Sequence, residues 1–192
     1  LPSLRASRPL VRRATTGGVA ISVEQVVVTL GATGALSLAL VHSVPLGKEV
    51  LLPSPFYSAH PKAIELLGRK VRIVAPSNGR RLTAEDLARA VTPDTAACLL
   101  TNPGNPTGAV YRKGELLELV KALPNDVVVL SDEVYADFLY EGKFSSMLEV
   151  VAEEGKDRLA YSFQSGSKTV GMPGWRVGAL IASSPLAPEL TR

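Results

Sequence analysis

Short apolar runs alternate along this chain with segments in which apolar residues recur at helical spacing. Runs such as 127–130 are apolar on both faces, which is typical of strands in a parallel sheet that helices cover on both sides. Strands that alternate with helices form βαβ units, and these units build such a sheet. The sequence therefore predicts an α/β fold of three layers, with a mainly parallel seven-stranded sheet between two layers of helices. The expected strands are 25–29, 49–53, 70–74, 96–101, 127–131, 160–163 and 177–182, and the expected helices are 33 or 34 to about 44, 57–67, 83–90 and 112–123.

Composition indicates a single globular domain spanning 1–192, because 46% of the 192 residues are hydrophobic and 20% are charged. The one cysteine, Cys98, lies in an apolar run, and we expect a buried thiol in a reducing compartment. We therefore expect a cytoplasmic protein with no disulfide and no metal site. A net charge of +3 is mild, and no apolar run approaches the length of a membrane span, so neither nucleic acid nor membrane is an expected partner.

The segment 1–23 is basic, with no acidic residue before Glu24. Organellar transit peptides and arms that bind nucleic acid have such a composition. A short amphipathic helix with a solvated basic face is the simpler interpretation, because leucine and valine residues fit one apolar face. The arginines concerned are Arg5, Arg8, Arg12 and Arg13.

Ligands of parallel α/β sheets bind beyond the carboxyl ends of the strands, so polar residues at these ends are candidates for a site. The segment 165–176 carries Lys168 and Arg176, eight residues apart among glycines and small hydroxyl residues. A lysine amine forms a Schiff base with an aldehyde, and a guanidinium binds a phosphate dianion through paired charged hydrogen bonds. Pyridoxal phosphate carries both groups, although an ordinary basic loop would show the same pattern.

Two further turns follow strands. The turn 30–36 leads into a helix, where free backbone amides and the Thr33 hydroxyl would form an anion site; a plain strand-to-helix turn is the alternative. Prolines and glycines fix the loop 101–108, which presents Asn105. The Asn105 amide would donate to a phenolate oxygen or would only cap its own turn.

Asp132 follows the apolar fifth strand, where an unpaired buried carboxylate would be costly. A pyridinium nitrogen would pair with this carboxylate and remain protonated; alternatively, Asp132 caps the next segment. Glu133 is expected to have only a surface or structural role. Tyr135 would bring its hydroxyl to the same ligand, and Tyr57 would stack on a cofactor ring or fill the core.

Taken in order, these motifs resemble those of the class I and II aminotransferases, the aspartate-aminotransferase-like pyridoxal-phosphate enzymes of fold type I. The segments 105–108, 132–135 and 165–176 carry the resemblance, which extends over nearly the whole sequence. It implies that Lys168 forms the Schiff base and moves a proton between substrate and cofactor. It also implies that Asp132 pairs with the pyridine nitrogen.

The resemblance assigns the other contacts with pyridoxal 5′-phosphate as well. Asn105 and Tyr135 would bond the phenolic oxygen, with Tyr135 among the catalytic residues, and Tyr57 would stack on the ring. The phosphate would be held by Ala32, Thr33, Ser165 and Arg176.

By the same resemblance, the protein would be a homodimeric aminotransferase acting on an amino acid and a 2-oxo acid. Family chains are longer, so we expect this sequence to be the large cofactor-binding domain without the small C-terminal domain. Leu1 stands where family members have a tyrosine that reaches the partner's phosphate, which weakens the expected dimer contact. The alternatives are a truncated domain or pseudoenzyme that binds the cofactor without efficient turnover, and a lyase or synthase of the same fold. A nucleotide-binding doubly wound domain is disfavoured, because the sequence has neither a dinucleotide fingerprint nor a P-loop.

Overall fold

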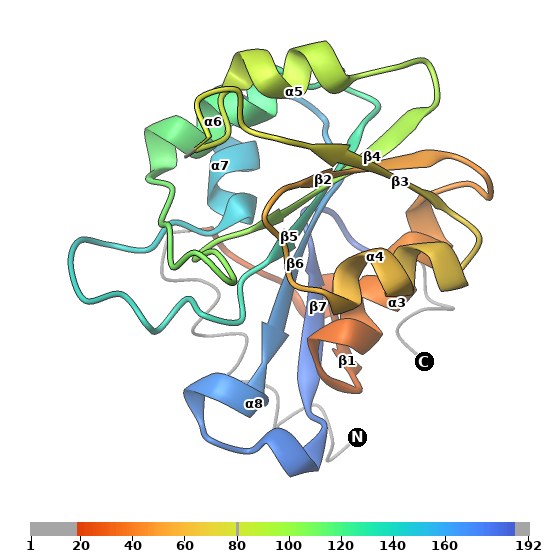
Figure 1. Ribbon diagram of the computed structural model, residues 1–192. Coiled ribbons are helices and arrows are strands. Elements are labelled where there is room, and N and C mark those ends of the chain that lie inside the picture. The colour runs from red at the N-terminus through yellow and green to blue at the C-terminus, as the bar shows by residue number, and fades with distance from the viewer. Residues whose placement is uncertain (1–18, 80, 187–192) are drawn as a thin grey trace.

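The computed structural model describes residues 19–79 and 81–186, so most of the basic segment 1–23 lies outside the described residues. The strands are β1 (Val26–Thr29), β2 (Glu49–Pro53), β3 (Lys70–Val74), β4 (Thr95–Thr101), β5 (Val128–Asp132), β6 (Ala160–Ser165) and β7 (Gly178–Ala182). They form one seven-stranded sheet in the order β1-β7-β6-β5-β4-β2-β3 (Figure 1). Four neighbouring pairs are parallel, and β7 is antiparallel to both β1 and β6. The prediction of a mainly parallel seven-stranded sheet is confirmed.

Helices cover both faces of this sheet, which confirms the predicted three layers (Figure 1). One face carries α5 (Ala84–Ala90), α6 (Lys113–Lys121) and α7 (Met147–Glu154), and the other carries α3 (Gly31–Ser43) and α4 (Ala59–Leu66). A short helix, α8 (Gly166–Thr169), follows β6, and the single turns η1 (Val23–Gln25) and η2 (Pro173–Trp175) precede β1 and β7. None of the helices in the described ranges is both long and apolar enough to cross a membrane.

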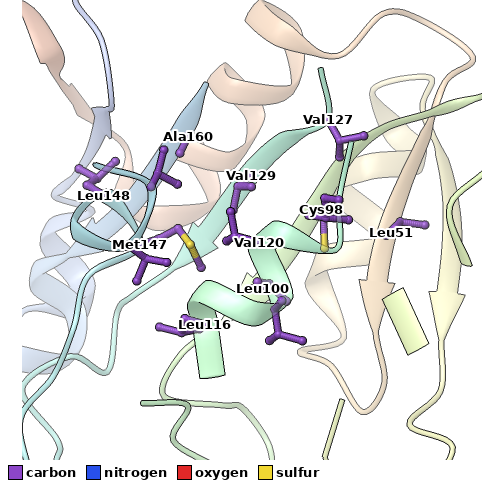
Figure 2. Close-up of a cluster of buried hydrophobic side chains, with 14 of the residues drawn as sticks. Leu51, Cys98, Leu100, Leu116, Val120, Val127, Val129, Met147, Leu148 and Ala160 are labelled. Atoms are coloured by element: carbon purple, nitrogen blue, oxygen red, sulfur yellow. The ribbon is translucent and has the colours of Figure 1, made fainter. Parts of the chain in front are cut away.

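Each face of the sheet has its own hydrophobic core, because successive residues of a strand point to opposite sides. On β4, Cys98 and Leu100 belong to the core under α5, α6 and α7 (Figure 2), whereas Leu99 belongs to the core under α3 and α4. Val129 and Leu130 divide in the same way on β5. Burial of each such side chain stabilises the fold by about 1.5 to 3 kcal/mol. The same burial raises the pKa of the Cys98 thiol to about 12.

The helix α7 is missing from the helices predicted above, although its signals are present in the sequence. The Ser146 hydroxyl caps its first turn by accepting a hydrogen bond from the Leu148 amide (3.4 Å). Gly155 ends the helix in the left-handed conformation, with φ of 72°. Between these caps, apolar residues at 147, 148, 150 and 151 face the core.

Other predicted boundaries differ by one or two residues. The first strand begins at Val26 because Gln25 belongs to the turn η1, where its side chain donates to the Ala182 carbonyl oxygen (2.9 Å). α4 begins at Ala59, after Ser58 as its N-cap residue. α6 begins after Arg112, whose amide donates to Glu115 in the first turn (2.8 Å).

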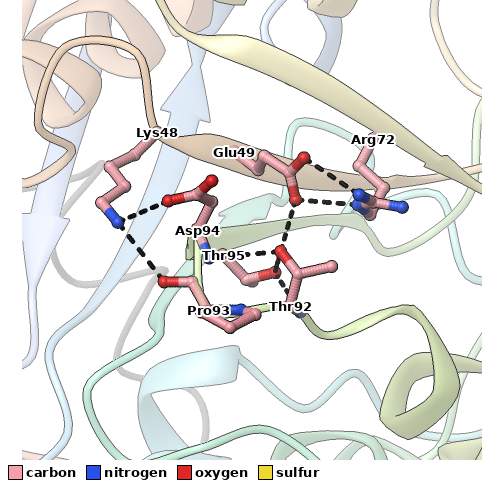
Figure 3. A network of polar contacts seen from close by, with 7 residues as sticks. All are labelled: Lys48, Glu49, Arg72, Thr92, Pro93, Asp94 and Thr95. Atoms are coloured by element: carbon pink, nitrogen blue, oxygen red, sulfur yellow. Dashed lines mark hydrogen bonds and ion pairs between the residues drawn. The ribbon is translucent and has the colours of Figure 1, made fainter.

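A polar network lies beside the amino ends of β2 and β4 (Figure 3). Arg72 donates two hydrogen bonds to the Glu49 carboxylate (2.8 and 3.0 Å), and Lys48 pairs with Asp94 (2.7 Å). The Arg72 hydrogen bond, assisted by the Thr92 hydroxyl, lowers the pKa of Glu49. These ion pairs hold the strand starts together and leave the opposite, carboxyl ends of the strands for the site.

Candidate functional site

A cavity of about 280 Å³ lies beyond the carboxyl ends of the central strands. Its walls come from the first turns of α3 and α4, the end of β5, the loop after β4, and the segment around α8. Every residue that the sequence predicts for the site lines this one cavity: Ala32, Thr33, Tyr57, Asn105, Asp132, Tyr135, Ser165, Lys168 and Arg176.

Asp132 is the last residue of β5 and is buried, with 7% of its surface exposed. Its Oδ1 accepts a hydrogen bond from the Val134 amide (3.3 Å), so the predicted cap is present. Its Oδ2 lies 3.0 Å from Nε2 of His60, which comes from α4. A carboxylate can only accept, so Nε2 carries the proton and donates to Asp132. Each oxygen thus has one hydrogen-bond partner, and a carboxylate oxygen can accept a second hydrogen bond, so the cap does not exclude a ligand in the cavity.

His60 is a site residue that the sequence prediction missed. Its side chain is buried, and its Nδ1 has no hydrogen-bond partner in the described part of the chain. The available signal was its position three residues after Tyr57, which places the two rings close together at the start of α4. The rings meet edge to face, with 5.4 Å between centroids, and Tyr57 remains 44% exposed at the cavity wall.

Asn105 and Tyr135 approach one another across the cavity from two different loops. The Asn105 amide donates to the Tyr135 hydroxyl over a long 3.4 Å. Backbone hydrogen bonds hold the loop that carries Asn105, because the Gly104 amide donates to Ala109 (2.8 Å) and the Gly108 amide to Gly104 (2.9 Å). The arrangement presents an amide donor and a phenol side by side.

Lys168 lies on α8, whose first turn is capped by the Ser165 hydroxyl accepting from the Ser167 amide (3.1 Å). The Lys168 amine lies 5.7 Å from the centroid of the Tyr135 ring and is exposed to solvent. The one primary amine among the cavity residues therefore lies at the same end as the pair Asn105 and Tyr135.

Arg176 lies at the carboxyl end of the segment 165–176. Its guanidinium donates to the Pro173 carbonyl oxygen (3.0 Å) and to the Ser167 hydroxyl (3.4 Å). Its backbone is left-handed, with φ of 51°, a conformation that costs a non-glycine residue roughly 1 kcal/mol. This turn aims the guanidinium toward the start of α3.

The start of α3 and the Arg176 guanidinium lie against each other, at the cup that the sequence predicts for an anion. A Cβ atom on Gly31 would lie only 2.6 Å from Nη2 of Arg176 and would displace the guanidinium, and the φ of 71° at Gly31 independently favours glycine. The N-cap residue Leu30 makes no side-chain hydrogen bond to the first turn of α3, and among the described residues the amides at Ala32 and Thr33 are candidate donors. The anion site and the plain turn at 30–36 both stay predictions, and the closeness of the Arg176 guanidinium favours the anion site.

Glu133 corrects one expectation, because a surface position is excluded. It is 1% exposed, and its carboxyl accepts hydrogen bonds from side chains and backbone on the face of the sheet opposite the cavity. This burial raises the pKa of Glu133. In the described ranges, no three side chains of the metal-ligating types come close enough to hold a metal ion.

Comparison with known proteins identifies the family. The family model described as aminotransferase class I and II matches residues 6–192. The chain belongs to this family. Membership confirms the resemblance that the motifs carry, while the role of each site residue stays a prediction.

Individual members of the aminotransferase family are similar over most of the chain. The aspartate aminotransferase of Thermotoga maritima is 38% identical over 175 residues, which are 90% of this chain and 46% of that protein. The aromatic-amino-acid aminotransferase 2 of Thermococcus litoralis is 33% identical over 172 residues, covering 88% and 43%. The crystal structure of the aspartate aminotransferase from Rhizobium meliloti superposes with a TM-score of 0.82 at 28% identity, covering 94% of this chain and 46% of that one. The chain thus spans under half the length of these aminotransferases.

Proposed function

We propose that this chain is the pyridoxal-phosphate-binding part of an aminotransferase that moves an amino group between an amino acid and a 2-oxo acid. The observation that carries the proposal is the convergence of an amine, a buried carboxylate and a guanidinium on one cavity, in Lys168, Asp132 and Arg176. Family membership and the names of the relatives, which include aspartate and aromatic-amino-acid aminotransferases, support it.

The donor set fits pyridoxal phosphate group by group. When bound, the cofactor would supply an aldehyde and a protonated pyridine ring that accepts electron density from the substrate α-carbon. The cup at Gly31 and Arg176 suits its phosphate, and the Asp132 carboxylate suits a ring N–H. The pair Asn105 and Tyr135 offers donors to its phenolic oxygen.

Asp132 would hold a proton on the pyridine nitrogen by charge and by hydrogen bonding. His60 fixes one oxygen of this carboxylate and the Val134 amide fixes the other. The carboxylate is therefore oriented before any ligand arrives, which reduces the cost of ordering the site on binding.

Lys168 would condense with the cofactor aldehyde and, once released by the incoming amino group, would move a proton at the substrate α-carbon. Its place beside Asn105 and Tyr135 suits this chemistry, because the aldehyde and the phenolic oxygen stand on adjacent carbons of the ring. Arg176 and the start of α3 would hold the phosphate and so fix the distance from Lys168 to the ring.

We also propose that the whole protein is a homodimer. Two large apolar side chains flank the anion cup and are exposed, Leu30 at 77% and Trp175 at 72%. Exposed apolar surface around a polar site is typical of a surface that another subunit covers.

The proposal is tested by titrating the protein with pyridoxal 5′-phosphate and recording the visible absorbance. Saturable binding with a new absorbance band is expected for the unsubstituted chain, and Lys168→Ala should abolish the band. Lys121→Ala, at the exposed end of α6, is the matched control and should leave the band intact.

Aspartate, alanine and an aromatic amino acid are then added separately to the cofactor-loaded protein. Loss of the band with release of the matching 2-oxo acid supports an aminotransferase. Binding without this conversion would favour a domain that holds the cofactor without turnover, and release of ammonia would favour a lyase. An absence of any saturable binding would overturn the proposal.

A further inference from the structure

The Glu133 carboxyl is a buried junction that the proposed chemistry does not use. Its Oε1 accepts from the Met147 amide (2.7 Å) and from the hydroxyls of Ser131 (3.1 Å) and Ser146 (3.2 Å). Its Oε2 accepts from the hydroxyls of Ser162 (2.7 Å) and Ser146 (2.9 Å) and from the Gln164 amide (3.1 Å). Ser146 thus bridges both oxygens.

These partners join three parts of the fold. Ser131 belongs to β5, Ser162 and Gln164 belong to β6, and Ser146 and Met147 begin α7. The connection 134–146 leaves β5 directly after Glu133 and returns to the same carboxyl at the start of α7. The Glu133 side chain therefore ties the start of the loop that carries Tyr135 to the end of that loop by hydrogen bonds.

Glu133 also stands between the two catalytic segments of the proposed site. The preceding residue, Asp132, faces the cavity, and the Glu133 amide donates to the Phe163 carbonyl oxygen of β6 (3.1 Å). Gln164 is followed by Ser165, the cap of the helix α8 that carries Lys168. The backbone and the side chain of Glu133 therefore both connect the Asp132 segment to the β6 residues that precede the Lys168 segment.

We propose that Glu133 is a positioning residue, which fixes the Asp132 to Tyr135 segment against β6 and thereby sets the place of the Asp132 carboxylate and the Tyr135 hydroxyl relative to the Lys168 amine. Its action on a bound cofactor rests on the proposed function, whereas its action on the two segments does not. Glu133 does not line the cavity, so any effect on the ligand is indirect.

A carboxyl suits this position because both of its oxygens face N–H donors. The Met147 backbone amide donates to Oε1 and can only donate, and the Gln164 side-chain amide donates to Oε2. In Glu133→Gln an amide nitrogen replaces one acceptor, so it either opposes the Met147 N–H or requires the Gln164 amide to turn over, which would also reverse the hydrogen bond between Gln164 and Ser162. The double variant Glu133→Gln with Gln164→Glu exchanges the amide and the carboxyl, and so restores a matched pair.

The control is Glu154→Gln. The Glu154 side chain is 1% exposed like that of Glu133, but it lies at the far end of α7 and pairs with Arg158 (2.9 Å). This control should destabilise the same helix at the amino ends of β5 and β6, because Arg158 donates to Val127 there, and so leave the Glu133 junction at their carboxyl ends intact. Urea unfolding should be used to check that every variant is folded under the conditions of the test.

The first measurement is amide hydrogen exchange of the full chain without cofactor. Exchange in the ranges 132–136 and 164–168 should accelerate about ten- to a hundredfold in Glu133→Gln, the ratio that corresponds to one charged hydrogen bond. It should remain unchanged there in Glu154→Gln and return toward the original rate in the double variant. Equal protection in all variants, or equal acceleration in the control, would overturn the inference.

The second measurement is the dissociation constant of pyridoxal 5′-phosphate and the pH dependence of its bound absorbance. Glu133→Gln should raise the dissociation constant about tenfold and shift the pH profile, while Glu154→Gln should change neither. Unaltered binding and an unaltered profile in Glu133→Gln would also overturn the inference. If the unsubstituted chain binds no cofactor, the proposed function fails, and hydrogen exchange still decides the role of Glu133.

Discussion

Gly178→Ala is expected to disturb the proposed site through the backbone alone. Gly178 opens β7 and pairs with Thr29 of β1 on one side and Ser165 of β6 on the other. A Cβ atom there would lie 2.6 Å from the carbonyl carbon of Gly31 and 2.7 Å from the carbonyl oxygen of Gln164. Both are backbone atoms in the described structure, so no change of rotamer relieves the overlap.

The size of the effect follows from these distances. For ordinary contact, the distance from the new Cβ atom to the Gly31 carbonyl carbon would have to grow from 2.6 to 3.4 Å, so the start of α3 and β7 would have to move apart by about 0.8 Å. Overpacking of this kind costs about 1 to 3 kcal/mol, and the rigid neighbours put Gly178→Ala at the upper end. Gly31 opens α3 and forms the cup with Arg176, so the affinity for a phosphate-bearing ligand should fall about tenfold as well.

Urea unfolding followed by circular dichroism, with a parallel titration with pyridoxal 5′-phosphate, measures both effects. Gly174→Ala is the matched control, because a Cβ atom there meets no atom of the other described residues within 4 Å, apart from its two chain neighbours. The control should stay within about 0.5 kcal/mol of the original free energy of unfolding. The reasoning would be refuted if Gly178→Ala were as stable as Gly174→Ala and bound the ligand equally well.

Two further predictions concern buried groups. The pKa of about 12 and full burial should make Cys98 inert to a thiol reagent at pH 8 until the protein unfolds, so its labelling rate should track urea unfolding; rapid labelling of the folded chain would contradict this. Burial raises the folded-state pKa of Glu133 above the ordinary 4.5, so its contribution to stability is complete below that pH and is lost as pH rises through the folded-state pKa. The free energy of unfolding of the original chain relative to Glu133→Gln should therefore fall from acid to neutral pH, and a flat or rising difference would contradict the assignment.

The sequence predicts the sheet well because strands that are buried on both faces appear as continuous apolar runs. Such a run can be recognised from its own residues, without knowing which strands lie beside it. The same logic places Asp132, Asn105 and Lys168 together, since the carboxyl ends of parallel strands meet at one edge. Side-chain contacts between residues that lie far apart in the sequence cannot be predicted in this way. The hydrogen bond from His60 to Asp132 joins residues 72 positions apart and leaves no periodic signal in the sequence.

Two other features could not be predicted for the same reason. Glu133 is an acid after a strand, which suggests exposure, and only the fold shows that hydroxyls and amides from β6 and α7 surround it. The need for glycine at Gly178 arises because the backbones of Gly31 and Gln164 lie against it, and Gly31 has a positive φ of 71° that favours glycine. By contrast, α7 could have been predicted, because Ser146 is a typical cap at its start and Gly155 is a typical residue at its end.

Borohydride reduction of the protein loaded with pyridoxal 5′-phosphate, followed by peptide mapping by mass spectrometry, tests the central claim most directly. Reduction should fix one cofactor per chain on Lys168, the amine that the described fold places in the cavity with Asp132 and Arg176. An adduct mapped instead to Lys70 at the start of β3 or to Lys121 at the end of α6 would contradict the account.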